Sequence, residues 1–113
     1  MKAGYVPDTG DVVWLTFDPQ AGHGQRGRRP ALVVSPRAYN RWRGLALVCP
    51  ITSLAKGRSF EVALPPDSPI AGVVLADHLK SVDWKVRRAK FAAPVPSSVL
   101  TEVREKLRPL LGL

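Results

Sequence analysis

Short apolar runs, separated by proline, glycine and polar residues, make up most of the chain. The first run, at 12–17, is rich in β-branched and aromatic side chains and is followed by Asp18 and Pro19, which is typical of a strand. No helical pattern alternates with these runs, so we expect antiparallel pairing. The pattern predicts a small, strongly bent antiparallel sheet or barrel of six to seven strands, at 12–17, 31–35, 45–52, 60–64, 73–76, 79–82 and 91–95, with a turn or short helix at 38–41.

The period of the pattern changes near the C-terminus. Pro96 and Ser97 can start and cap a helix, and the apolar residues that follow are spaced as on one helical face. Pro109 lies within this stretch, and we expect it to distort the helix because proline lacks a backbone N–H and crowds the preceding turn. The chain is therefore predicted to be mostly β with a C-terminal α-helix, whose buried face carries Val99, Leu100, Val103, Leu107, Leu110 and Leu111.

The length and composition fit one domain. The chain has 113 residues, of which 45% are hydrophobic, so we take residues 1–113 as a single domain with a packed core. No run approaches the roughly 18 apolar residues of a membrane-spanning helix, and the N-terminus lacks the apolar stretch of a signal peptide. We therefore expect a cytoplasmic protein with no membrane partner. The one cysteine, Cys49, lies in an apolar run and is expected in the core.

The charge of the chain points to a polyanionic partner. Seventeen Lys and Arg residues against nine Asp and Glu residues give a formal net charge of +8. No carboxylate occurs between Asp18 and Glu61, a stretch that holds many of the arginines, and a second basic run follows at 85–90. Solubility alone does not require such segregation of charge. Nucleic acid is the first candidate partner, and acidic proteins and lipid headgroups are the next candidates.

The absence of several sequence motifs excludes the enzyme classes that depend on them. The sequence has no HExxH, CxxC, GxxxxGK[ST] or GxSxG motif, and no convincing carboxylate cluster for two-metal phosphodiester cleavage. A pairing of its two histidines stays open from the sequence alone. We therefore expect any chemistry on nucleic acid to need no metal ion and no cofactor. RNA allows this, because its own 2′-hydroxyl can act as the nucleophile.

Two segments could supply the parts of such a reaction. At 24–30 a glycine-rich loop delivers arginines to the start of a strand, and a guanidinium matches two phosphate oxygens with its forked donors. At 50–53 hydroxyl side chains follow the most apolar strand, where they can be held rigidly.

Five segments, in order and spacing, resemble the MazF/PemK/Kid family of toxins from bacterial toxin–antitoxin pairs. The resemblance covers nearly the whole chain. The chain departs from the family pattern at Gly24, where many relatives carry glutamate, and at Arg28, which is often histidine. The segments are YVPDTGDVVW at 5–14, FDP at 17–19, RPALVVSP at 29–36, PITS at 50–53 and LADHLKSVDW at 75–84.

The resemblance implies both a fold and an activity. It implies a small SH3-like (PemK-like) barrel, a homodimer, and sequence-specific endoribonuclease activity on single-stranded RNA that leaves 2′,3′-cyclic phosphate and 5′-hydroxyl ends. It also implies a cognate antitoxin whose disordered acidic segment covers the RNA groove, with DNA contacted only through the toxin–antitoxin complex. The family's catalytic arginine and hydroxyl residue correspond here to Arg29 and Thr52.

Further residues are candidate RNA contacts. We expect Gln25, Arg28, Ser53 and Lys56 to touch phosphates or bases. His78 is interpreted as a structural histidine, hydrogen-bonded near Asp77, and is not placed in the catalytic site.

Two other functions fit part of the pattern. A basic barrel could bind nucleic acid without cutting it, and in that case affinity would fall gradually as arginines are removed. A toxin of this shape could instead inhibit a protein such as gyrase, although such a toxin would not need Arg29 and Thr52 to handle phosphate.

Overall fold

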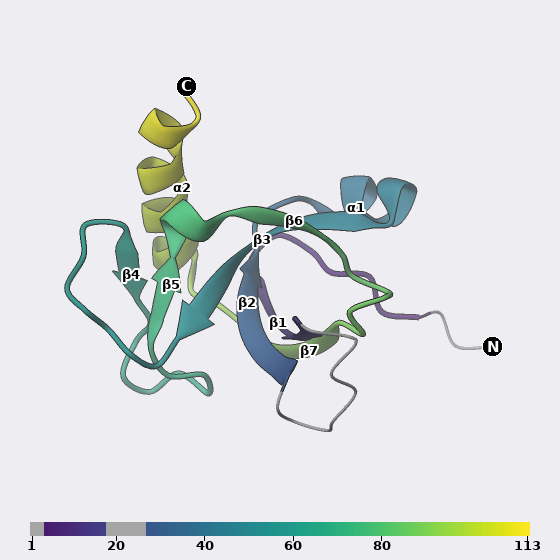
Figure 1. Ribbon diagram of the computed structural model, residues 1–113, viewed down its shortest axis with the longest axis horizontal. Helices are drawn as coiled ribbons and strands as arrows, with labels where there is room; N and C mark the ends of the chain where they lie inside the picture. Colours follow the sequence, from purple (N-terminus) through teal and green to yellow (C-terminus); the bar gives the residue numbers. More distant parts are fainter. Residues whose placement is uncertain (1–3, 18–26) are drawn as a thin grey trace.

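The computed structural model of the chain describes residues 4–17 and 27–113 (Figure 1). No helix in these two segments is long and apolar enough to span a bilayer. The described elements are β1 (Asp11–Thr16), β2 (Arg28–Val33), α1 (Arg37–Arg43), β3 (Leu45–Thr52), β4 (Glu61–Ala63), β5 (Val73–Leu75), the short 3₁₀ helix η2 (Ala76–His78), β6 (Lys80–Asp83), β7 (Lys90–Pro94) and α2 (Ser97–Leu110).

Strand β3 lies at the centre of the sheet. Along one edge it pairs with β2, from Ala31 opposite Pro50 to Val33 opposite Val48. Its other edge is shared, because β6 pairs with its first half and β5 pairs with its end. The remaining strands continue outward in the order β4-β5-β3-β2-β1-β7. Each of these strand pairings is antiparallel, as the sequence predicts.

The sheet bends but does not close into a complete barrel. It contains seven strands, and among the described residues its outer strands β4 and β7 do not pair with each other. Helix α2 contacts β4 and η2 beside the sheet (Figure 1). The predicted fold class, mostly β with a C-terminal helix, is confirmed, whereas the barrel is an open one.

The core lies on both faces of the bent sheet, because alternate residues of β1, β2 and β3 point to opposite sides. Cys49 belongs to one buried cluster, which α2 completes with Val99, Val103 and Leu107. Burial raises the pKa of the Cys49 thiol to about 12, and the prediction of a core cysteine is confirmed. The second cluster contains Val13, Leu15, Ala31, Val33, Ala46, Val48, Val82 and Trp84.

The predicted boundaries hold except at β2. Every other strand lies within one residue of its predicted range, but β2 begins at Arg28 rather than Ala31. The reason is pairing, since β1 continues along β2 as far as Thr16 opposite Arg28. Pro109 is the next-to-last residue of α2, so it coincides with the end of the helix and does not interrupt its middle.

A buried asparagine fastens α1 to the sheet. Asn40 is fully buried, and its Nδ2 donates to the carbonyl oxygens of Pro7 and Ser35 at 2.9 and 3.0 Å. Its Oδ1 accepts a 2.6 Å hydrogen bond from the Ser35 hydroxyl, which in turn accepts the Leu47 N–H of β3. The Trp84 indole donates to the Asn40 carbonyl. These bonds join the N-terminal segment, α1, β3 and the end of β6.

We expect Asn40→Ala to lower the free energy of unfolding by about 3 kcal/mol, because it strips partners from buried groups and each unsatisfied group costs roughly 1–3 kcal/mol. Denaturant unfolding measures the difference. Arg41→Ala, at an exposed neighbouring position of the same helix, is the control and should change stability by less than about 0.5 kcal/mol. Equal stability of the two variants would contradict the role assigned to Asn40.

Candidate functional site

The register of β2 and β3 relates the two predicted catalytic residues. The ladder ends at Ala31 opposite Pro50, and two further residues along each strand lead to Arg29 and Thr52. Residues at equivalent positions of antiparallel strands share a face. Beyond the ladder β3 turns to pair with β5, and Figure 1 shows β2 and β3 diverging there. Arg29 is exposed and Thr52 is partly buried, so both side chains lie at the rim where the strands part.

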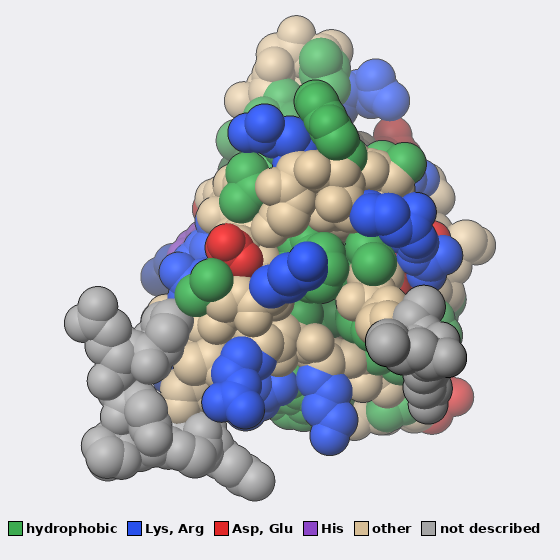
Figure 2. Space-filling model, turned by 90° about the vertical axis from the view of Figure 1, so that its right-hand side faces the viewer, with side chains coloured by type: hydrophobic (Ala, Val, Ile, Leu, Met, Phe, Trp, Pro, Cys, Tyr) green, Lys and Arg blue, Asp and Glu red, His purple; other side chains and the backbone are tan. Residues whose placement is uncertain are grey.

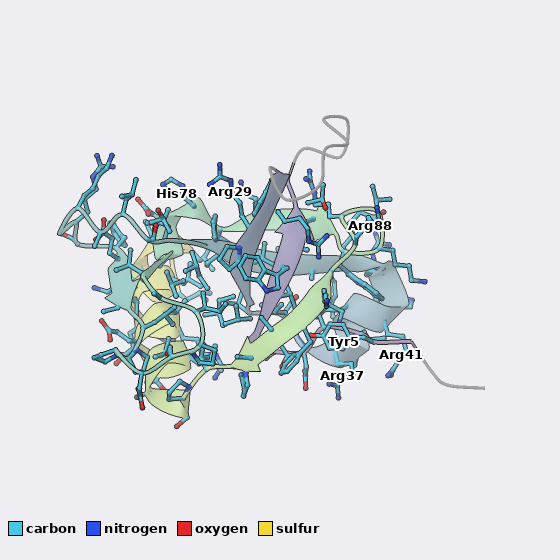
Figure 3. All side chains as sticks on the ribbon, turned by 90° about the horizontal axis from the view of Figure 1, so that it is seen from below. Tyr5, Arg29, Arg37, Arg41, His78 and Arg88 are labelled. Carbon is cyan, nitrogen blue, oxygen red and sulfur yellow. The ribbon has the colours of Figure 1, made fainter. Side chains whose placement is uncertain are left out.

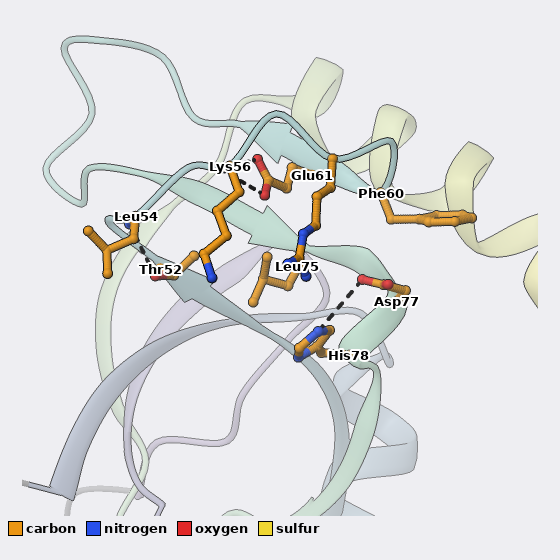
Figure 4. Close-up of a pocket in the computed structure, with 9 residues that line it drawn as sticks. Thr52, Leu54, Lys56, Phe60, Glu61, Leu75, Asp77 and His78 are labelled. Carbon is orange, nitrogen blue, oxygen red and sulfur yellow. Dashed lines mark hydrogen bonds and ion pairs between the residues drawn. The ribbon is translucent and has the colours of Figure 1, made fainter.

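A pocket of about 200 Å³ lies beside Thr52 (Figure 4). Its walls come from the end of β3, the loop at 53–60, the start of β4, the end of β5 and η2. The lining is mixed, with apolar side chains behind and charged ones around them. Its residues are Thr52, Leu54, Lys56, Arg58, Phe60, Glu61, Leu75, Asp77 and His78.

The hydroxyl of Thr52 is held by its own loop. Its Oγ1 accepts the N–H of Leu54 at 3.1 Å, which leaves the hydroxyl proton free to be donated elsewhere. Figure 4 shows the Lys56 side chain reaching toward Thr52. Ser53 follows directly and is exposed. The structure therefore brings Thr52, Ser53 and Lys56 together, as the sequence predicts for a site, while their roles stay predictions.

Glu61 organises the loop that carries Lys56. Its carboxylate accepts the backbone N–H of Lys56 at 3.1 Å from each oxygen and that of Gly57 at 3.0 Å. Lys106 of α2 donates to the Ser59 carbonyl at 2.6 Å and ties the same loop to the helix. The Glu61 carboxylate thus accepts hydrogen bonds from the backbone of its own loop. Lys56 and Arg58 of this loop line the pocket, where they can contact an anion.

Gly72 allows the end of β3 to lie where it does. Its φ of +122° is a conformation that other residues rarely adopt, and a Cβ there would lie 2.1 Å from the carbonyl oxygen of Thr52. The chain before β5 therefore presses directly against the backbone that carries the Thr52 side chain. This role of Gly72 cannot be predicted from the local sequence, because the contact joins residues 20 positions apart.

His78 lies at the pocket. Its side chain is 51% exposed and lines the pocket, and its structural role stays a prediction. Its Nε2 lies 3.9 Å from the Asp77 Oδ1, which is too long for the predicted hydrogen bond. Figure 3 shows His78 and Arg29 on the same side of the molecule. The sequence indicates a place near a site for His78 only through its position, because His78 follows the end of a predicted strand, as Ser53 does.

Arg28 does not join this group. Its guanidinium donates to the Thr16 hydroxyl at 3.1 Å and to the Arg88 carbonyl at 3.2 Å. Arg88 lies away from His78 and Arg29 in Figure 3. RNA contact by Arg28 stays a prediction for a separate position, and Gln25 lies outside the described residues.

Positive charge also covers other parts of the surface. Figure 2 shows Lys and Arg side chains spread among apolar ones, with few acidic groups, on the side where α1 lies. On α1, Trp42 is 77% exposed and Arg43 stacks on its ring at 5.5 Å from the centroid. Within residues 4–17 and 27–113, no three His, Cys, Asp or Glu side chains are grouped to hold a metal ion.

Comparison with known proteins gives consistent matches. Residues 8–111 match the family model described as the PemK-like, MazF-like toxin of type II toxin–antitoxin systems. The endoribonuclease toxin MazF of Escherichia coli K12 is 42% identical over 112 residues, which is 99% of this chain and all of the relative. The endoribonuclease PemK of Escherichia coli is 36% identical over 108 residues, covering 92% of this chain and 81% of the relative.

Solved structures agree with the sequence matches. The crystal structure of MazF from Deinococcus radiodurans has a TM-score of 0.88 and 60% identity, covering 97% of this chain and all of the other. A MazE–MazF complex from the same organism has a TM-score of 0.88 and 55% identity, covering 97% of this chain and 99% of the other.

We expect Gly72→Ala to lower the free energy of unfolding by more than about 2 kcal/mol, because a left-handed backbone costs a side chain roughly 1–2 kcal/mol and the new Cβ also meets the Thr52 carbonyl. Gly57→Ala is the matched control: its φ is +71°, but a Cβ there meets nothing within 4 Å. Denaturant unfolding compares the two. A Gly57→Ala variant as unstable as Gly72→Ala would contradict the contact.

Proposed function

Because the chain belongs to the PemK-like, MazF-like toxin family of type II toxin–antitoxin systems, we propose that it is an endoribonuclease toxin that cuts single-stranded RNA, mRNA above all, without a metal ion. The curated relatives, MazF and PemK, are named endoribonucleases. The observation that carries the finer proposal is the placement of Arg29 and Thr52 at equivalent positions of two diverging strands, beside a pocket lined by Lys56 and Arg58.

These side chains suit transfer of the phosphoryl group to the 2′-hydroxyl. As the 2′-oxygen attacks phosphorus, negative charge grows on the phosphate oxygens. The Arg29 guanidinium can donate to two of these oxygens at once. The Thr52 hydroxyl, whose oxygen already accepts the Leu54 N–H, can donate a hydrogen bond to the same group and keeps its proton. The 5′-oxygen then leaves, and the products are a 2′,3′-cyclic phosphate and a 5′-hydroxyl end.

The same arrangement supports independence from metal ions and sequence selectivity. The substrate supplies the nucleophile, and cationic side chains supply the charge stabilisation that a metal would otherwise give. Ser53 and Lys56 are exposed beside Thr52, where they can contact the bases or phosphates that flank the cut. Arg28 is a further proposed RNA contact at the start of β2, and Gln25 is proposed as another from the sequence alone.

The proposed partners follow from charge and from the structural relatives. The net charge of +8 favours an antitoxin with a disordered acidic segment that covers the RNA site. Similar solved structures include MazE–MazF complexes. We propose a homodimer that acts on RNA in the cytoplasm and meets DNA only within the toxin–antitoxin complex.

The first test is cleavage of a long single-stranded RNA in excess EDTA. We expect discrete cuts that leave 5′-hydroxyl ends, and a rate about 10²–10³ lower for Arg29→Ala because one charge-stabilising donor is lost. Arg41→Ala removes an exposed arginine of α1 and serves as the charge-matched control, with cleavage close to wild type. Intact RNA that still binds in a salt-sensitive manner would favour a non-catalytic module, and cleavage that requires Mg²⁺ would refute the metal-free reaction.

A second test concerns the Thr52 hydroxyl. Thr52→Val keeps the shape of the side chain but removes its donor, so we expect single-turnover cleavage to slow by about 10²–10³. Thr52→Ser keeps the hydroxyl and should retain most of the rate. Affinity for an RNA with a 2′-deoxy sugar at the cut, which cannot react, should be similar for both variants. Equal rates for Val and Ser at this position would remove Thr52 from the reaction.

A further inference from the structure

We propose that His78 is the general base that takes the proton of the attacking 2′-hydroxyl, an inference that rests on the ribonuclease function proposed above. His78 lines the same pocket as Thr52 and Lys56, and half of its side chain is accessible. It is the histidine in the described part of the chain, since His23 lies outside it.

The other groups at the pocket are poor bases for this step. Guanidinium and ammonium groups hold their protons at neutral pH, which excludes Arg29, Lys56 and Arg58. The Glu61 carboxylate already accepts backbone N–H groups from the loop. An imidazole changes protonation between pH 5 and 8 in its ordinary range, which makes it the best matched base near neutrality.

Asp77 gives His78 the surroundings of a base. The Asp77 carboxylate lies 3.9 Å from His78 Nε2, close enough for its charge to act on the ring. The same carboxylate stabilises the imidazolium that forms when the ring accepts a proton. Lys56 and Arg58 line the same pocket from the loop, where they can meet the phosphate.

Position agrees with this role. In Figure 4 the His78 ring lies below Asp77 at the mouth of the pocket, and Figure 3 shows it on the same side as Arg29. η2 contacts β3 directly, so the base and Thr52 are carried by adjoining elements. The pocket that Thr52 lines is therefore lined by His78 as well, so a phosphate bound beside Thr52 would face both side chains.

The 2′-O–H proton passes to the unprotonated ring nitrogen of His78, the 2′-oxygen forms a bond to phosphorus, and the bond from phosphorus to the 5′-oxygen breaks. The leaving 5′-oxygen takes a proton from solvent water. The imidazolium then returns its proton to the hydroxide that remains. No redox partner is involved.

The test compares His78→Gln with wild type in single-turnover cleavage in EDTA. We expect the rate to fall by about 10²–10⁴, the usual contribution of general acid–base catalysis. The wild-type rate should rise with pH, because a general base acts in its unprotonated form, and this rise should be absent in the variant. Added imidazole should restore part of the activity of His78→Gly. Glu102→Gln, exposed on α2, is the control.

Two further measurements separate catalysis from binding and positioning. Affinity for the 2′-deoxy RNA should be nearly the same for His78→Gln and wild type. Asp77→Asn should slow cleavage about tenfold, because the imidazolium that forms loses its carboxylate partner. A Gln variant with the wild-type rate and pH profile, or one that loses affinity as much as rate, would overturn the role of His78. Wild-type protein that leaves RNA intact would instead refute the proposed function itself.

Discussion

The sharing of β3 among three neighbours is the constraint on which the rest of the structure depends. One edge pairs with β2, while the other is divided between β6 and β5, so the sheet must bend where β3 passes from one partner to the next. That bend separates the ends of β2 and β3 and leaves Thr52 at a rim. The core and the site thus share one strand, since β3 contributes Ala46, Val48, Cys49 and Ile51 to the core and ends at the partly buried Thr52.

Much of this arrangement could be predicted from the sequence, and the remainder depends on contacts that the sequence does not encode locally. The bounds of β3 and the helix at 97–110 follow from hydrophobic period, because period reports the burial of each side chain. Arg29 and Thr52 came from family resemblance, since neither stands out by residue type. The contact of Gly72 with the Thr52 carbonyl and the position of His78 at the pocket do not follow from the local sequence, because each depends on residues far along the chain.

The acidic and basic side chains of the pocket have different roles, which the composition of the chain does not reveal. A carboxylate beside an anion-binding pocket would ordinarily repel the ligand, yet Glu61 is turned to the backbone of its own loop and there orders the segment that bears Lys56. Asp77 lies 3.9 Å from the His78 imidazole, and its side chain is also exposed to solvent. Elsewhere Phe17 lies between Lys80 and Arg87, each within 6.0 Å of its ring, so part of the excess positive charge is held against aromatic surface.

The buried thiol of Cys49 gives the protein a built-in reporter of its own opening. Its sulfur lies 3.8 Å from the Ala76 carbonyl, across the seam between β3 and η2. Because the thiolate is disfavoured in this seam, an alkylating reagent can reach and modify the sulfur only when the two elements separate. The labelling rate of the unmutated chain therefore measures how often β3 and η2, the elements that end at Thr52 and His78, separate from each other.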